Sequence, residues 1–125
     1  MHHTREIPRE GWADYLFLLS TVECDQQVRI QAGGPELGDQ TVVWDLPLVE
    51  IAVEEKGSEA GAIEVTVGRP GEEITHRIFH PERIYADEGE SGELECLDIE
   101  DADHVKTLIY FESRELLEEA SAPPA

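Results

Sequence analysis

The sequence predicts an α+β fold: a twisted antiparallel sheet, or a small open barrel, of about seven short strands with an N-terminal helix. Three observations predict it. Apolar residues recur at helical spacing near the start of the chain. Further along they recur at every second position, as in half-buried strands. The turns between these runs are short and rich in Gly and Pro. Because parallel strands need long crossovers, such turns indicate antiparallel pairing.

The first predicted element is a helix over Pro8–Ser20. Pro8 suits a first helical position, because its φ is pre-set and its missing N–H would be unpaired there. Trp12, Tyr15, Leu16 and Leu19 then recur at helical spacing. Phe17 and Leu18 lie outside this stripe and widen the apolar surface. We therefore expect Trp12, Phe17 and Leu18 to form a surface that packs on the sheet or on a second subunit.

A β-hairpin is predicted over Ala62–Gly68 and Glu73–Phe79, where apolar and polar residues alternate. The sequence Gly68-Arg69-Pro70-Gly71 supplies the turn. His80-Pro81 is expected to end the second strand, because Pro lacks a ladder donor.

Shorter runs complete the predicted sheet. The remaining strands are expected over Gln27–Ala32, Thr41–Trp44, Leu48–Glu54, Arg83–Ala86, Leu94–Ile99 and Val105–Glu112. Asp45-Leu46-Pro47 is expected to separate the strand Thr41–Trp44 from the strand Leu48–Glu54. A short helix, Arg114–Ala120, is predicted after Ser113, which could act as its cap.

At 125 residues the chain is expected to form one domain, 1–125, with flexible ends at 1–6 and 121–125. No apolar run approaches the roughly 18 residues that span a bilayer. The N-terminus has no apolar core of the kind that a signal peptide needs, so a cytoplasmic location is expected. Cys24 and Cys96 are expected to be reduced, with a disulfide only if their strands are adjacent.

Charge is the strongest feature of the composition: 29 Asp and Glu against 9 Lys and Arg give a formal charge of -20. Such a chain lacks the basic surface that nucleic acids and anionic membranes require. Two interpretations stay open. The acidic surface could be an adaptation to high salt, or it could recognise a basic protein partner.

Histidines are the main candidates for chemistry. On one extended strand, His76 and His80 would lie about 13 Å apart, too far to share one zinc ion. We therefore expect no metal site and no cofactor. Trp44, His76 and Arg77 are the candidate binding residues, and no catalytic residue is identified, because the serines lack a nucleophile elbow.

Three short motifs resemble those of a short bacterial family of unknown function. They are IPREGW (Ile7–Trp12), GPELG (Gly34–Gly38) and THRIFHPERI (Thr75–Ile84). The resemblance spans most of Glu6–Phe111 and implies a bacterial, single-domain, soluble protein. It implies no activity and no site residues.

Three functional hypotheses follow. The first is a non-enzymatic binding or assembly module that forms a homodimer through the apolar helix surface. The second is a small-molecule or metal-dependent enzyme with a site near His76, which requires a concave pocket with convergent polar groups. The third is an acidic partner of a basic protein.

Overall fold

A computed structural model describes residues 3–35, 38–58 and 60–112, without the side chains of Asp39 and Trp44. The elements are β1 (His3–Ile7), the 3-10 helix η1 (Arg9–Gly11), α1 (Trp12–Val22), β2 (Gln27–Gly34), β3 (Gly38–Val53), β4 (Ile63–Val67), β5 (Ile74–Ile78), β6 (Pro81–Glu88), β7 (Leu94–Asp101) and β8 (Lys106–Phe111). The helix predicted over 114–120 and the end at 121–125 lie outside these residues.

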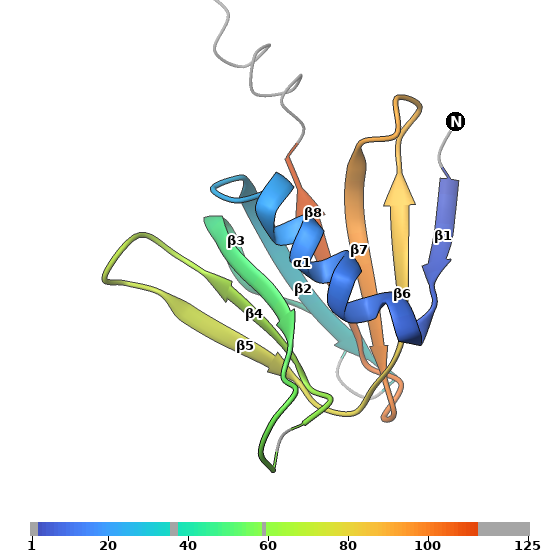
Figure 1. The fold of residues 1–125 in the computed structure, drawn as a ribbon. Coiled ribbons are helices and arrows are strands. Elements are labelled where there is room, and N and C mark those ends of the chain that lie inside the picture. Colours follow the sequence, from blue (N-terminus) through green and yellow to red (C-terminus); the bar gives the residue numbers. More distant parts are fainter. Residues whose placement is uncertain (1–2, 36–37, 59, 113–125) are drawn as a thin grey trace, which may run out of the picture.

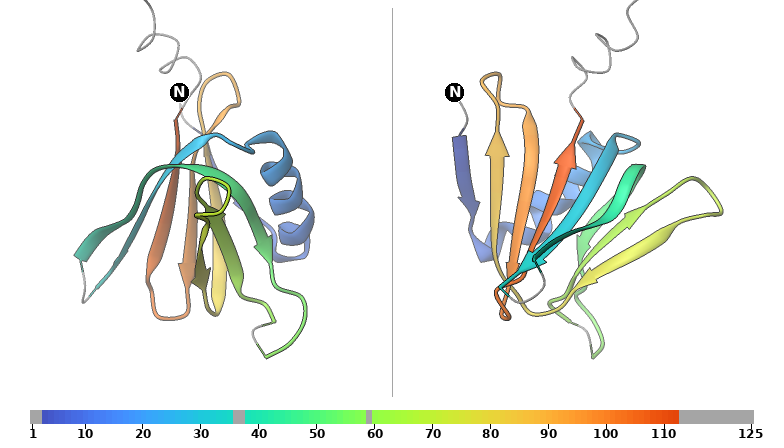
Figure 2. Two further views of the ribbon diagram at one scale, coloured as in Figure 1. Left: turned by 90° about the vertical axis from the view of Figure 1, so that its left-hand side faces the viewer. Right: turned by 180° about the vertical axis from the view of Figure 1, so that it is seen from behind.

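The eight strands form one sheet in the order β1-β6-β7-β8-β2-β3-β4-β5. Every neighbouring pair is antiparallel. The helix α1 crosses one face of the sheet, and the view from behind shows the opposite face (Figures 1 and 2). The predicted antiparallel sheet with an N-terminal helix is therefore confirmed, but the described residues contain eight strands where about seven were expected.

β3 is one long strand, although an interruption was predicted at residues 45–47. Its first half pairs with β2 and its second half, from Leu48, pairs with β4. Asp45 takes a positive φ of 42° just before this change, where the β2–β3 ladder is irregular between the pairs Val28–Leu46 and Ile30–Val43. Pro47, which has no N–H to donate, lies where one ladder ends and the next begins. The strand thus bends without ending, and it carries the sheet around a corner.

The connection between β5 and β6 shows how strongly the sheet curls. It consists of residues 79 and 80 alone, yet β7, β8, β2, β3 and β4 lie between the two strands in the sheet. The end of β5 must therefore lie close to the start of β6. The sheet stays open, with β1 and β5 as its edges. β5 ends before His80-Pro81, as predicted, and His80 makes the corner with a φ of 52°.

β1 is a strand that was not predicted, and most of it lies within the end at residues 1–6 that was expected to be flexible. His3–Ile7 pairs with β6 from Glu88 to Ile84. Four of its five side chains are exposed, so it carries no alternation of buried and polar residues that would have revealed a strand. Arg5 pairs across the ladder with Glu88, at 3.2 Å.

The helix begins later than predicted, at Trp12, because residues 9–11 form the 3-10 turn η1. The buried Trp12 indole donates a hydrogen bond to the carbonyl oxygen of Ile7, at 2.9 Å. Arg9 lies over the Trp12 ring and donates to the carbonyl oxygen of Pro81, at 3.0 Å. These contacts fix the start of the helix to β1 and β6.

The core lies between α1 and the concave face of the sheet. Trp12, Leu16 and Leu19 of the helix are buried against it. The fully buried sheet residues include Ile30, Ile51, Ile63, Ile84, Leu97, Ile99 and Ile109.

Candidate functional site

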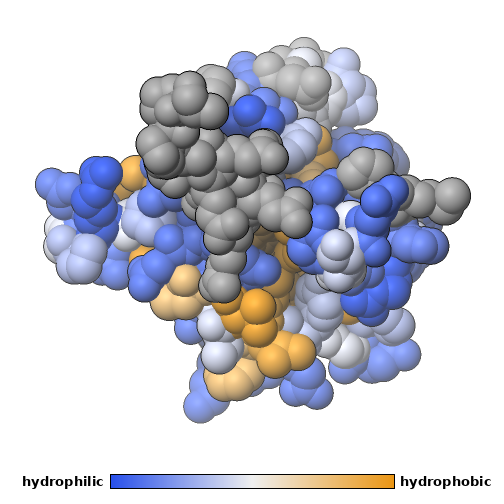
Figure 3. Space-filling model, turned by 90° about the horizontal axis from the view of Figure 1, so that it is seen from above, coloured by the Kyte–Doolittle hydropathy of each residue, from blue (hydrophilic) through white to orange (hydrophobic). Residues whose placement is uncertain are grey.

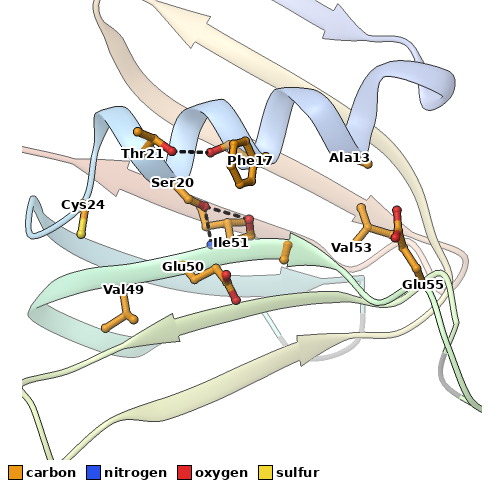
Figure 4. A pocket seen from close by; sticks show the side chains of 11 residues that line it. Ala13, Phe17, Ser20, Thr21, Cys24, Val49, Glu50, Ile51, Val53 and Glu55 are labelled. Carbon is orange, nitrogen blue, oxygen red and sulfur yellow. Dashed lines mark hydrogen bonds between the residues drawn. The ribbon is translucent and has the colours of Figure 1, made fainter.

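A groove lies between α1 and β3. Its volume is about 540 Å³, and it is open to solvent. We call it the α1–β3 groove (Figure 4). It is lined by Ala13, Phe17, Ser20, Thr21, Cys24, Val49, Glu50, Ile51, Ala52, Val53 and Glu55.

The groove exists because β3 leaves β2 before it ends. From Leu48 onward, one side of β3 pairs with β4, and the other side faces α1. Ser20 occupies this open side. Its hydroxyl accepts a hydrogen bond from the Ile51 N–H at 2.8 Å and lies 2.9 Å from the Ile51 carbonyl oxygen. One helix side chain thus gives the Ile51 N–H its acceptor and fixes the distance between the helix and the strand.

The side of α1 that faces away from the sheet is apolar. Phe17 is 75% exposed, Leu18 61% and Val22 60%. We call the exposed side chains of this helix the outer face of α1; they are Ala13, Asp14, Phe17, Leu18, Thr21 and Val22. Seen from above, apolar surface gathers on the side of the molecule where α1 lies, with hydrophilic surface around it (Figure 3).

The surface predicted from Trp12, Phe17 and Leu18 is divided between two roles. Trp12 is buried in the core. Phe17 and Leu18 point to solvent, and Phe17 also lines the α1–β3 groove. Trp12 therefore packs the helix on the sheet, and the side chains of Phe17 and Leu18 are left exposed.

A second, smaller hollow lies beside β5, where the curled sheet brings β5 near the β7–β8 turn. We call it the β5 cavity; its volume is about 210 Å³. It is lined by Ala32, His76, Arg77, Ile78, Phe79, Asp101, Asp103, Val105 and Thr107. Two of the three predicted binding residues, His76 and Arg77, therefore meet here. Trp44 belongs to the first half of β3, and its side chain lies outside the described part of the structure.

The polar side chains around the β5 cavity differ in their protonation and in their bonding partners. Burial lowers the pKa of His76 below its usual value, which favours the neutral imidazole. Arg77 pairs across the ladder with Glu64, at 3.2 Å. One carboxylate oxygen of Asp101 accepts hydrogen bonds from the backbone N–H groups of Asp103 and Val105. The aspartates thus supply negative charge to the cavity, and Asp101 also holds the turn.

The two cysteines differ in their exposure to solvent. Cys24 is exposed at one end of the α1–β3 groove, and Cys96 is buried in β7; both are free thiols. Burial, and next the charge of Asp98, raise the pKa of Cys96 to about 12. Its thiol is therefore protonated at neutral pH and a poor nucleophile.

Metal ligands do not converge in the described part of the chain: no three side chains of His, Cys, Asp or Glu come together there. Of the helices that the structure describes, none has the length and apolar character to span a bilayer.

Sequence reasoning missed the α1–β3 groove. The expected break at residues 45–47 hid the fact that the second half of β3 leaves β2 and turns one side towards the helix. The available signal was Ser20, a hydroxyl residue directly after the apolar run of the helix. Its partner Ile51 is 31 residues away, so the sequence did not reveal the contact.

Comparison with known proteins agrees with the resemblance in the motifs. The chain is 27% identical over 106 residues to an uncharacterized protein of Aquifex aeolicus (strain VF5), which covers 85% of this chain and 89% of that protein. No solved structure matches it. Residues 3–120 match the family of unknown function DUF5335. Because this match covers nearly the whole chain, the protein belongs to that family, as the three motifs predicted.

Proposed function

We propose that the protein is a non-enzymatic assembly module that forms a homodimer through the outer face of α1 and the adjacent α1–β3 groove. The observation that carries this proposal is the near absence of charge from an exposed, apolar helix face. Large exposed apolar patches on small proteins mark interaction sites, and the cores of interfaces are depleted in charged residues.

Charge favours a second copy over a basic partner. α1 has one charged residue, Asp14, among its eleven residues, whereas the chain as a whole has 29 acidic residues. Two copies of charge -20 repel each other, so they can meet only where carboxylates are sparse. A basic partner would instead be recognised by carboxylates at the contact. The outer face of α1, where Asp14 is the one carboxylate, has the composition that the first situation requires; Glu50 and Glu55 lie across the groove from it.

Sedimentation equilibrium over a wide range of protein concentration tests the proposal. We expect a monomer–dimer equilibrium that shifts towards the dimer as KCl rises, because salt screens the repulsion between copies. Phe17→Ser should weaken the dimer by about thirtyfold in Kd, as expected for an aromatic anchor at an interface. Leu18→Ser should also weaken it.

Val42→Ser is the matched control, because Val42 is an exposed apolar residue of β3 outside this surface. It should leave the dimer unchanged. A monomer at every concentration and salt level would contradict the proposal. Binding to a basic protein that is lost on adding salt, and lost in Phe17→Ser, would instead identify this surface as the site of a basic partner.

A further inference from the structure

The part of the chain that the structure describes ends at Glu112, beside the end of α1. The Glu112 N–H donates a hydrogen bond to the Gln27 carbonyl oxygen at 3.2 Å, and the Gln26 side-chain amide donates to the Glu112 carbonyl oxygen. Gln26 follows closely after Val22, the last residue of α1. Figure 1 accordingly shows the end of β8 and the end of α1 at the same end of the molecule. The residues after Glu112 therefore begin next to the outer face of α1.

The sequence that follows has the pattern of a short helix with one apolar side. In the helix predicted over 114–120, Leu116, Leu117 and Ala120 would share one side, because Ala120 lies three and four residues after the two leucines. The opposite side would carry three carboxylates, those of Glu115, Glu118 and Glu119. A helix this short is unstable alone in water, so it needs a surface that covers its leucines.

The extent of the family match indicates that this segment belongs to the domain. The match covers residues 3–120. It therefore continues past Phe111, where β8 ends, and stops where the predicted helix stops. The matched positions include both leucines but not residues 121–125. Chain ends without a packing role tolerate change, so a match of this extent favours a packing role for the leucines.

The outer face of α1 fits the segment in length, polarity and charge. Phe17, Leu18 and Val22 each expose 60% or more of their surface. They span about 8 Å along the axis of α1, and a helix over 114–120 is about 10 Å long. Asp14, the one carboxylate of the face, lies in the first turn of α1, at the end away from Val22. The apolar side of the segment can therefore contact the face while its acidic side points to solvent.

We propose that residues 113–120 fold back along the outer face of α1, antiparallel to it, and cover the apolar side chains through which the protein dimerises. The contact is autoinhibitory, and this consequence rests on the proposed dimer, because a second copy can bind only where the segment is displaced. A segment that covers the face for about two-thirds of the time leaves each copy competent for about one-third. Since a dimer needs two competent copies, the cover weakens it by about tenfold in Kd.

NMR of the full-length protein, at a concentration where it is monomeric, tests the cover by itself. We expect helical ¹³Cα shifts over 114–120, and NOEs from the methyl groups of Leu116 or Leu117 to the Phe17 ring or the Leu18 methyl groups. The absence of these shifts or of these NOEs would overturn the proposal.

Two variants and one alternative contact locate the cover. Phe17→Ser should at least halve the helical shifts over 114–120, because the segment is helical only when it is docked. Val42→Ser is the matched control and should leave them unchanged, because Val42 is exposed outside the outer face of α1. NOEs from Leu117 to Leu108 would overturn the proposal, because Leu108 alternates with buried residues of β8 and lies on the opposite face of the sheet.

Sedimentation equilibrium of full-length variants tests the competition with the second copy. Leu116→Ser combined with Leu117→Ser should strengthen the dimer by about tenfold in Kd, because the face is then uncovered. Leu116→Met combined with Leu117→Met is the matched control; it keeps the apolar contact and should leave Kd unchanged within about twofold. A weaker dimer in the Ser variant would overturn the proposal, because the segment would then be part of the dimer contact. An unchanged Kd would overturn it as well.

Failure of the dimer and failure of the cover give different results. A monomer in every variant, together with the NOEs to Phe17 or Leu18, overturns the proposed dimer and supports the cover. A dimer with the same Kd in every Leu116 and Leu117 variant, without those NOEs, overturns the cover and supports the dimer.

Discussion

Ser20 joins α1 to the open side of β3 through a single hydroxyl group. It accepts from the Ile51 N–H and lies 2.8 Å from the carbonyl oxygen of Leu16, one turn earlier in the helix. The hydroxyl provides the acceptor for the Ile51 N–H that a neighbouring strand would otherwise provide. Loss of the hydroxyl would leave a partly buried N–H without its partner.

Ser20→Ala should therefore destabilise the protein by about 1–3 kcal/mol, the cost of an unpaired buried backbone group. Thr21→Ala is the matched control. Thr21 also bonds one turn back, to the Phe17 carbonyl oxygen at 3.1 Å, but it is exposed and does not bridge to β3. Its loss should change stability by no more than about 0.5 kcal/mol. Urea unfolding curves measure both changes, and equal effects of the two variants would refute this role of Ser20.

At the scale of single residues, the sequence predicts which side chains of the helix are buried, but it does not predict what the exposed ones beside them contact. The spacing of Trp12, Leu16 and Leu19 predicts which side chains are buried, because a helix brings them to one face. The same pattern cannot tell that Phe17 lies at the rim of a groove, because the other wall comes from β3.

Asp45 has a positive φ of 42° in the irregular part of the β2–β3 ladder. Residues with a Cβ pay about 1–2 kcal/mol in this region, and Gly does not. Asp45→Gly should consequently be more stable than Asp45→Ala by about 1 kcal/mol. The order should reverse at Gln40, an exposed position in the first half of β3, where Gly costs about 0.5–1 kcal/mol relative to Ala. Thermal unfolding of the four variants measures both differences. The same order at both positions would mean that the bend does not strain Asp45.

Strands were predicted correctly where buried and exposed side chains alternate. The prediction failed where a strand lacks this alternation or where its continuity depends on a change of pairing partner. The β4–β5 hairpin was predicted because Ile63, Val65 and Val67 share one buried face. Its turn also follows from sequence: at Gly68, with φ of 127°, an added Cβ would lie 2.7 Å from the Glu72 carbonyl oxygen. In contrast, β1 has no alternation to detect. The continuity of β3 through Pro47 depends on a change of ladder partner that local sequence does not encode.

At the scale of the molecule, the candidate sites depend on curvature more than on motifs. The α1–β3 groove needs β3 to leave β2, and the β5 cavity needs the curl that brings Asp101 beside His76. Of the predicted binding residues, His76 and Arg77 both line the β5 cavity, because they are neighbours on one strand. Sequence reasoning could not supply the aspartates, which are more than twenty residues away along the chain. Strand spacing alone gives no measure of how far a sheet curls.

The net charge of -20 should make stability depend on salt. Nine basic residues can neutralise at most a third of the 29 acidic ones, and the Arg5–Glu88 and Lys106–Glu100 pairs are themselves partly exposed. Repulsion among the remaining carboxylates disfavours the compact state, and salt screens it. Raising KCl from about 0.1 M to about 1 M should therefore raise Tm, by roughly 3–6 °C for each kcal/mol of repulsion removed.

Screening must be separated from the dimer, because a dimer that salt strengthens also raises Tm by mass action. The measurement is therefore made on Phe17→Ser at two protein concentrations, where Tm should rise with salt by the same amount at both. Choline chloride should act as KCl does at equal ionic strength, since screening does not depend on the identity of the cation. A larger effect of KCl would indicate bound cations instead. An unchanged or lower Tm would mean that the acidic surface does not repel itself enough to affect folding.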